Sequence, residues 1–97
     1  MSYEINPKNF NPIFEAVGCI IESEEKIILL KRKNSSIQGN KWGIPSGKIE
    51  KNESPQKAIK REVFEETGIK IEKAKHKKTY NVRHDKKLDF VYHLFYV

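Results

Sequence analysis

The chain has 97 residues and a formal net charge of +6, and 37% of its residues are hydrophobic and 33% charged. This length allows one domain with a modest core, and the composition is that of a globular, water-soluble protein. A membrane-spanning helix is excluded, because no apolar run approaches the ~18 residues that it needs. Residues 1–11 are polar and lack the apolar region of a signal peptide, so we expect a cytoplasmic protein.

Cysteine and lysine usage narrow the possible functions. The only cysteine is Cys19, which rules out an intrachain disulfide and a zinc site built from several cysteines. It lies in the apolar run 17–21, so we expect a buried, unreactive thiol. The positive charge fits a polyanionic partner, either nucleic acid or a phosphorylated small molecule, or simple solubility. No tight basic run with interleaved aromatic residues occurs, so the pattern of a nucleic-acid-binding protein is weak.

The first third of the chain predicts an irregular start followed by a β-hairpin. Residues 1–11 contain a proline and several asparagines, which favour irregular backbone. Residues 13–22 are rich in β-branched side chains and predict a largely buried strand. After a polar turn at 23–25, the apolar run 26–31 predicts a second strand, and we expect these two strands to pair.

Two irregular segments separate this hairpin from the next regular element. Residues 32–41 are rich in asparagine, serine and glycine and predict a loop. A loop of this length suits substrate contact, and a disordered surface loop is the equally weighted alternative. Residues 42–47 read Trp-Gly-Ile-Pro-Ser-Gly, and two glycines and a proline in six residues forbid a regular helix. We expect the backbone to turn sharply there.

A helix is predicted over residues 55–67. Ser54 is a favoured N-cap, and Pro55 suits the first helical position because its missing N–H costs nothing there. Gly68 tolerates positive φ and is a good helix stop. An apolar stripe at helical spacing predicts the buried face, and it consists of Ala58, Ile59 and Val63.

The last third of the chain predicts a second hairpin. Residues 69–83 are rich in lysine, but their apolar side chains alternate in the manner of an extended strand. Residues 84–87 predict a turn, and residues 88–97 are aromatic and β-branched, which is typical of a strand. The three histidines lack metal-ligand spacing; we expect His76 and His84 to be exposed, and the tyrosines to pack on the sheet.

The predicted helix carries a cluster of acidic residues. Glu62, Glu65 and Glu66 stand at i, i+3 and i+4, which places three carboxylates on one side of a helix. Their mutual repulsion calls for compensation, and a hard divalent cation with oxygen ligands such as Mg²⁺ provides it. Arg61 offsets part of the charge and reaches Glu53 if the preceding loop folds back. The alternative is a solvated, Glu-rich helix face that binds no metal.

At these residues the chain resembles the Nudix, or MutT-like, hydrolases. Their sequence motif, the Nudix box, spans residues 47–69 here without a mismatch, and the lead-in 42–45 resembles the family's usual entry to it. Nine positions at fixed spacing make the resemblance highly specific. The matching residues are Gly47, Glu53, Arg61, Glu62, Val63, Glu65, Glu66, Gly68 and Ile69.

The resemblance implies an α/β fold, an α/β/α sandwich around a mixed sheet. It implies hydrolysis of a phosphoanhydride bond in a nucleoside diphosphate linked to another moiety, such as a nucleotide sugar, a dinucleoside polyphosphate or a nucleoside triphosphate. Mg²⁺ or Mn²⁺ would be the cofactor, and a small nucleotide would be the partner, with neither membrane nor nucleic acid expected. The implied metal ligands are Glu62, Glu65, Glu66 and the backbone carbonyl of Ser46. The implied catalytic set is Glu53, Arg61, Glu62 and Glu65, with Gly47 and Gly68 in structural roles.

The chain departs from the family pattern in two places. Ser46 stands where many relatives have glycine, although a backbone carbonyl remains available there. Relatives usually continue beyond the last strand, so we expect residues 1–97 to form a single, C-terminally truncated domain that lacks its last strand and helix. Homodimerisation would compensate for the lost sheet coverage.

Two alternatives to a hydrolase remain. The first is a nucleotide-binding or sensor module with this fold and weak catalysis, and the second is a basic nucleic-acid-binding protein. Candidate substrate-binding residues outside the acidic cluster are Arg32, Lys48 and Arg83.

Overall fold

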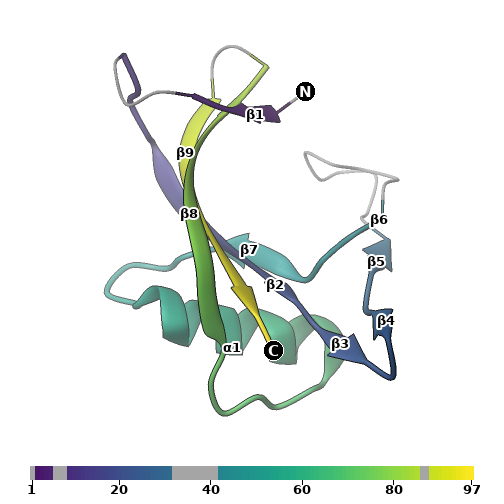
Figure 1. Cartoon of the computed structure of the whole chain (residues 1–97). Helices are drawn as coiled ribbons and strands as arrows, with labels where there is room; N and C mark the ends of the chain where they lie inside the picture. Colours follow the sequence, from purple (N-terminus) through teal and green to yellow (C-terminus); the bar gives the residue numbers. More distant parts are fainter. Residues whose placement is uncertain (1, 6–8, 32–41, 86–87) are drawn as a thin grey trace.

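The structure is a computed structural model that describes residues 2–5, 9–31, 42–85 and 88–97 (Figure 1). One helix and several strands make up the fold. They are β1 (Ser2–Glu4), β2 (Phe14–Ile20), β3 (Glu22–Ser23), β4 (Lys26–Ile27), β5 (Leu30–Lys31), β6 (Trp42–Gly43), β7 (Ser46–Lys48), α1 (Pro55–Thr67), β8 (Lys75–His84) and β9 (Leu88–Tyr96). Within the described ranges, no helix is long and apolar enough to cross a membrane.

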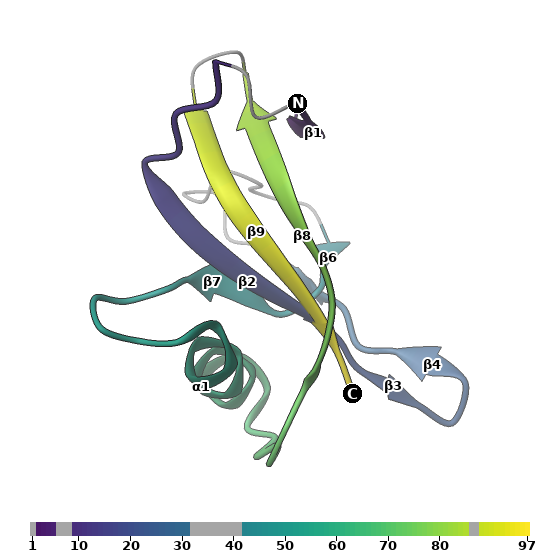
Figure 2. The ribbon, with the colours of Figure 1, turned by 60° about the vertical axis from the view of Figure 1, so that its left-hand side comes forward.

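A mixed five-stranded sheet forms the centre of the molecule, in the order β1-β8-β9-β2-β7. β8 and β9 form an antiparallel hairpin, which confirms the predicted pairing of the last two strands, although β8 begins at Lys75. β2 runs parallel to β9 and antiparallel to β7. The three long strands lie side by side, with α1 against one face of the sheet (Figure 2). This is the mixed α/β architecture that the sequence predicts.

Two predictions about the first third of the chain are wrong. The strand at 13–22 does not pair with 26–31 along its length, because β2 uses its two edges for β9 and β7. Only the short β3 and β4 form a hairpin, and β5 pairs with β6. The start of the chain is not wholly irregular either, since β1 pairs with β8. An edge strand of this kind is held by backbone hydrogen bonds, which its polar composition does not reveal.

The helix has the predicted bounds and caps. The Ser54 side chain accepts a hydrogen bond of 3.2 Å from the Lys57 N–H. Gly68 adopts φ 77° and donates its N–H to the Phe64 carbonyl. Such a left-handed residue stops a helix at little cost only when it is glycine. The predicted stripe of Ala58, Ile59 and Val63 is fully buried.

The core lies between α1 and the sheet. The helical stripe packs on Val17 and Cys19 of β2 and on Phe95 of β9. Burial raises the pKa of the Cys19 thiol to about 11, since a thiolate is poorly solvated there. The thiol therefore stays protonated at neutral pH, as predicted for a buried, unreactive cysteine.

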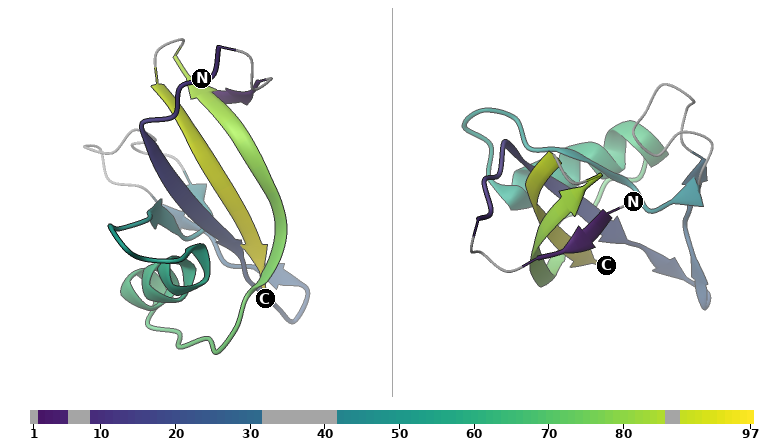
Figure 3. Two further views of the ribbon diagram at one scale, coloured as in Figure 1. Left: turned by 90° about the vertical axis from the view of Figure 1, so that its left-hand side faces the viewer. Right: turned by 90° about the horizontal axis from the view of Figure 1, so that it is seen from above.

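The opposite face of the sheet is aromatic. Phe14 stacks on Phe90 with ring centroids 4.8 Å apart, and Tyr92 meets Phe90 edge to face. The Tyr92 hydroxyl fills the space beside Gly18, where an added Cβ would overlap it. Among the described residues α1 is the single helix, and it covers the other face (Figure 3).

Candidate functional site

The acidic side of α1 packs against the short strand β7. The Ser46 N–H donates a 2.9 Å hydrogen bond to Oε1 of Glu66. The carboxyl group of Glu62 lies against Gly47, so closely that a Cβ at this glycine would overlap it. Glu65 points outward and its side chain is 54% exposed, whereas that of Glu62 is 12% exposed. The helix spacing and the glycine together bring two of the three predicted carboxylates onto one stretch of backbone.

Arg61 joins the helix to the loop before it. Its Nε and Nη2 each donate a 2.8 Å hydrogen bond to the carboxylate of Glu53, in a two-bond arrangement. Nη2 also donates to the Lys48 carbonyl at 3.1 Å, and Nη1 donates to Oε1 of Glu62 at 2.7 Å. Glu65 lies further away, 3.3 Å from Nη1. The predicted contact between Arg61 and Glu53 is therefore present, and the loop does fold back.

The ion pair between Arg61 and Glu53 shifts the pKa values of both groups. Hydrogen bonding to Arg61 lowers the pKa of Glu53 to about 2, helped by the hydrogen bond from the Glu50 N–H. The pKa of Arg61 is raised above its ordinary value, first by Glu53 and then by Glu62 and Glu65. Both groups are therefore charged throughout the physiological range, and this part of the site is a permanent electrostatic clamp.

The site carries more negative charge than Arg61 neutralises. Among the fixed positions of the box there are four carboxylates and one guanidinium, which leaves three negative charges. Oxygen-rich, negatively charged sites of this kind suit hard divalent cations. In the described part of the chain, no three His, Cys, Asp or Glu side chains yet form a metal-coordinating cluster. The geometry explains this, since Glu62 and Glu65 turn toward Arg61 while Ser46 holds an oxygen of Glu66.

The three predicted substrate-binding residues lie in different places. The Lys48 ammonium sits over the Phe14 ring, 4.5 Å from its centroid. Arg83 forms a two-bond ion pair with Asp89 at 2.6 and 2.8 Å. This pair belongs to the tip of the β8–β9 hairpin, which lies away from α1 (Figure 1). Arg32 and the loop 32–41 lie outside the described residues.

Sequence reasoning missed two features. The first is the Ser46 N–H, which fixes Glu66; its signal is the position of Ser46 just before the first glycine of the box. The second is a chain of contacts that brings two distant histidines together. Thr79 Oγ1 lies 2.8 Å from Nε2 of His76 and 3.0 Å from Nδ1 of His93. The His93 Nε2 in turn lies 2.7 Å from Glu15. His76 is exposed as predicted, but the His84 side chain is only 14% exposed, so that expectation is wrong.

Curated relatives match more than half of this chain. An ADP-ribose pyrophosphatase from Methanocaldococcus jannaschii is 45% identical over 54 residues, which are 56% of this chain and 31% of that protein. A CTP pyrophosphohydrolase from Escherichia coli is 42% identical over 57 residues, which are 59% of this chain and 42% of that protein. The chain thus spans less than half the length of these two relatives.

The fold and the family model extend the likeness to almost the whole chain. The crystal structure of a MutT protein from Methanosarcina mazei is 30% identical, with a TM-score of 0.76 over 89% of this chain and 65% of that one. A MutT NUDIX hydrolase from Burkholderia pseudomallei is 26% identical, with a TM-score of 0.78 over 87% of this chain and 65% of that one. The model of the NUDIX domain matches residues 12–97. The chain therefore belongs to the NUDIX domain family.

Proposed function

We propose that this chain carries out metal-dependent hydrolysis of a phosphoanhydride bond in a nucleoside diphosphate linked to another moiety. One observation carries the proposal: the Glu-rich side of α1 is held against β7 and clamped by Arg61. Relatives that match more than half of this chain are named pyrophosphatase and pyrophosphohydrolase, which supports the reaction class.

The residues present fit Mg²⁺ or Mn²⁺ as the cofactor. Glu62, Glu65 and Glu66 supply hard oxygen donors, and the Ser46 carbonyl is the proposed fourth ligand. Glu62 and Glu66 already lie along the Ser46–Gly47 backbone, so two of the proposed donors are near each other, and Glu65 would have to turn from Arg61 to join them. When bound, a divalent cation would neutralise diphosphate charge and lower the pKa of a water molecule.

The other residues of the site act by positioning. Arg61 holds Glu53 with two hydrogen bonds, so the loop stays fixed even when Glu62 or Glu65 turns from Arg61 toward a cation. The Ser46 N–H restrains Glu66, which lowers the conformational entropy that this side chain loses on binding. We therefore assign Glu62, Glu65 and Glu66 to the metal, and Arg61 and Glu53 to the support of those ligands.

The substrate can carry different groups on its diphosphate. Nucleotide sugars, dinucleoside polyphosphates and nucleoside triphosphates all contain the required bond. Lys48, beside the box, is the candidate phosphate contact among the described residues, and Arg32 is a further candidate; Arg83 is instead engaged with Asp89 at the tip of the β8–β9 hairpin. We place the activity in the cytoplasm, acting on a small nucleotide, and propose that the protein is a homodimer; light scattering at several concentrations tests the dimer.

The decisive experiment measures phosphate release from ADP-ribose, diadenosine polyphosphates and nucleoside triphosphates, with Mg²⁺ and with Mn²⁺. Glu65→Gln and Glu66→Gln should each lower the rate by about 10³-fold, since each removes a charged donor at the reacting diphosphate. Glu22→Gln is the matched control, because it makes the same change at an exposed position on β3. Unchanged rates in both box variants would overturn the assigned role of the box.

A second function is favoured by the resting geometry. Glu62 and Glu65 face Arg61 rather than an open metal position, which suits a nucleotide-binding or sensor module with weak catalysis. Calorimetry separates the two functions. Nucleotide binding in the presence of Mg²⁺ without phosphate release over hours would support the sensor, and turnover would exclude it.

A further inference from the structure

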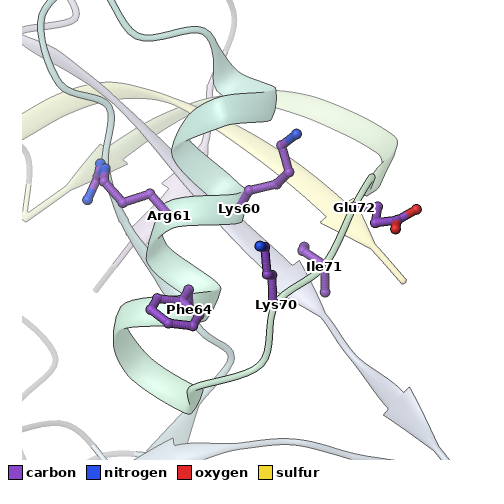
Figure 4. A pocket seen from close by; sticks show the side chains of 6 residues that line it. All are labelled: Lys60, Arg61, Phe64, Lys70, Ile71 and Glu72. Carbon is purple, nitrogen blue, oxygen red and sulfur yellow. The ribbon is translucent and has the colours of Figure 1, made fainter.

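A groove of about 640 Å³ lies along one side of α1 (Figure 4). It is formed by α1 and by the segment that follows the helix. Its lining residues are Lys60, Arg61, Phe64, Lys70, Ile71 and Glu72. Phe64 comes two residues after Glu62 and thus sits almost opposite it on the helix. The Phe64 part of the groove therefore lies away from Glu62, and Arg61 stands between the groove and the acidic side of α1.

The groove is lined in part by apolar side chains that the fold does not bury completely. The Phe64 side chain is 56% exposed, although a phenyl ring in water is unfavourable. Ile71 is half-buried and packs against the core from the groove side. A single exposed apolar residue is ordinary, but here a ring and an aliphatic side chain line one hollow. Together they give the groove two apolar side chains against which a planar ring can pack.

Cationic groups stand beside these apolar side chains. Lys60 lies one helical turn before Phe64, and Lys70 lies on the segment after the helix. Among the residues that the structure describes, neither ammonium group has an ion-pair partner. The Arg61 guanidinium points away from the groove toward Glu53, so this residue contributes its aliphatic stem (Figure 4). Glu72 adds one carboxylate at the other end.

We propose that this groove binds a nucleoside 5′-monophosphate. The base stacks on Phe64 and Ile71, and the phosphate lies between the two free ammonium groups of Lys60 and Lys70. Glu72 accepts a hydrogen bond from a ribose hydroxyl or an exocyclic amine. The groove volume is in the range of small-molecule sites, and the surplus positive charge complements a phosphate dianion. This site uses none of the proposed metal ligands, so it stands independently of the proposed hydrolysis.

The test is a titration of the ¹⁵N-labelled chain with AMP, followed by amide chemical shifts in buffer that contains EDTA. We expect saturable shifts confined to residues 60–72, with a Kd on the order of 1 mM or tighter. Adenosine and inorganic phosphate are titrated separately, and each should bind at least about tenfold more weakly than AMP. Shifts centred on residues 46–48, or equal binding of phosphate and AMP, would overturn the proposal.

Charge-matched variants sharpen the result. The double variant Lys60→Ala/Lys70→Ala should raise the Kd for AMP at least about tenfold. Lys57→Ala/Lys73→Ala removes the same charge from exposed lysines outside the groove, and should change the Kd by less than about twofold. Phe64→Ala should weaken AMP but leave phosphate binding unchanged. Equal losses of AMP affinity in the two double variants would show only a general attraction between the positive chain and the phosphate. That result would refute the site.

The outcome is distinguishable from that of the proposed hydrolysis. The variant Glu66→Gln should lose turnover while its AMP-induced shifts at residues 60–72 stay as in the parent chain. A chain that hydrolyses substrates but shows no such shifts would refute the groove alone. A chain that shows the shifts but has no turnover would refute the hydrolysis alone.

Discussion

Arg61 and Arg83 both hold carboxylates through two-bond contacts, yet the two clusters differ in charge. Arg83 binds Asp89, whose side chain is 7% exposed and also accepts a hydrogen bond from the Asn11 N–H. Hydrogen bonding to Arg83 lowers the pKa of Asp89 to about 2. Arg61 instead meets Glu53, Glu62 and, at longer distance, Glu65.

The comparison separates a structural ion pair from a candidate site. The pair at Arg83 ties the tip of the β8–β9 hairpin to the segment before β2, and this accounts for both groups. The cluster at Arg61 brings several carboxylates onto one side of a helix, where their repulsion lowers stability unless a cation compensates. An arrangement that costs stability in the resting protein, and that an added ion relieves, is typical of a functional site.

Replacing each arginine by lysine should affect the two clusters very differently. Lysine keeps the charge but cannot form the two-bond contact. We expect Arg61→Lys to lower kcat/KM by about 10- to 100-fold, because the ligand support is lost. Arg83→Lys should leave kcat/KM within about twofold and lower only the melting temperature. Similar kinetic losses in both variants would remove the distinction between the two clusters.

A smaller effect is expected from an added methyl group at Gly47. Gly47→Ala places a Cβ where the Glu62 carboxyl lies, and this flexible side chain must move. We expect about a tenfold loss of kcat/KM at a small cost in stability. Gly18→Ala is the control, because its Cβ meets the rigid ring of Tyr92. It should destabilise the fold by about 1–3 kcal/mol, as overpacking does, with kcat little changed. Parent-like kinetics in Gly47→Ala would argue against a working role for Glu62.

The smallest expected effect is a loss of folding stability at acid pH. The pKa of Glu53 falls from an ordinary 4.5 to about 2, and that of Asp89 falls from 3.8 to about 2. Each ion pair therefore stabilises the fold fully above the ordinary pKa, and this contribution is lost as pH drops toward 2. Urea unfolding between pH 7 and pH 3 should show falling stability below about pH 4.5. Glu53→Gln and Asp89→Asn should each flatten that decline, and a decline identical to the parent's in both would contradict these two assignments.

Local signals in the sequence predicted the helix and its clamp well. The bounds of α1, the cap at Ser54, the stop at Gly68 and the Arg61–Glu53 contact depend on neighbours within about one or two helical turns. The β8–β9 hairpin was predictable for the same reason, since its strands adjoin in sequence.

Partners that are distant in sequence were not predictable. Residue alternation marks a strand but does not say which strand lies beside it, so the partners of β2 were assigned wrongly. The meeting of His76 and His93 at Thr79 follows from the register of β8 and β9 and not from histidine spacing. The hold of Ser46 on Glu66 likewise needs β7 to lie beside the helix.

The parallel pairing of β2 with β9 has a consequence for how the molecule assembles. Phe14 pairs with Phe90 and Ile20 with Tyr96, so this ladder joins segments that the ribosome makes far apart in time. During synthesis, the edge of β2 that pairs with β9 has no partner until β9 has left the exit tunnel. Until then, the sheet surface on which α1 packs lacks the contribution of β9. Contacts of such large sequence separation slow folding. We therefore expect β8 and β9 to pair first as a local hairpin, and the docking of β2 on β9 to be the slow step that completes the sheet.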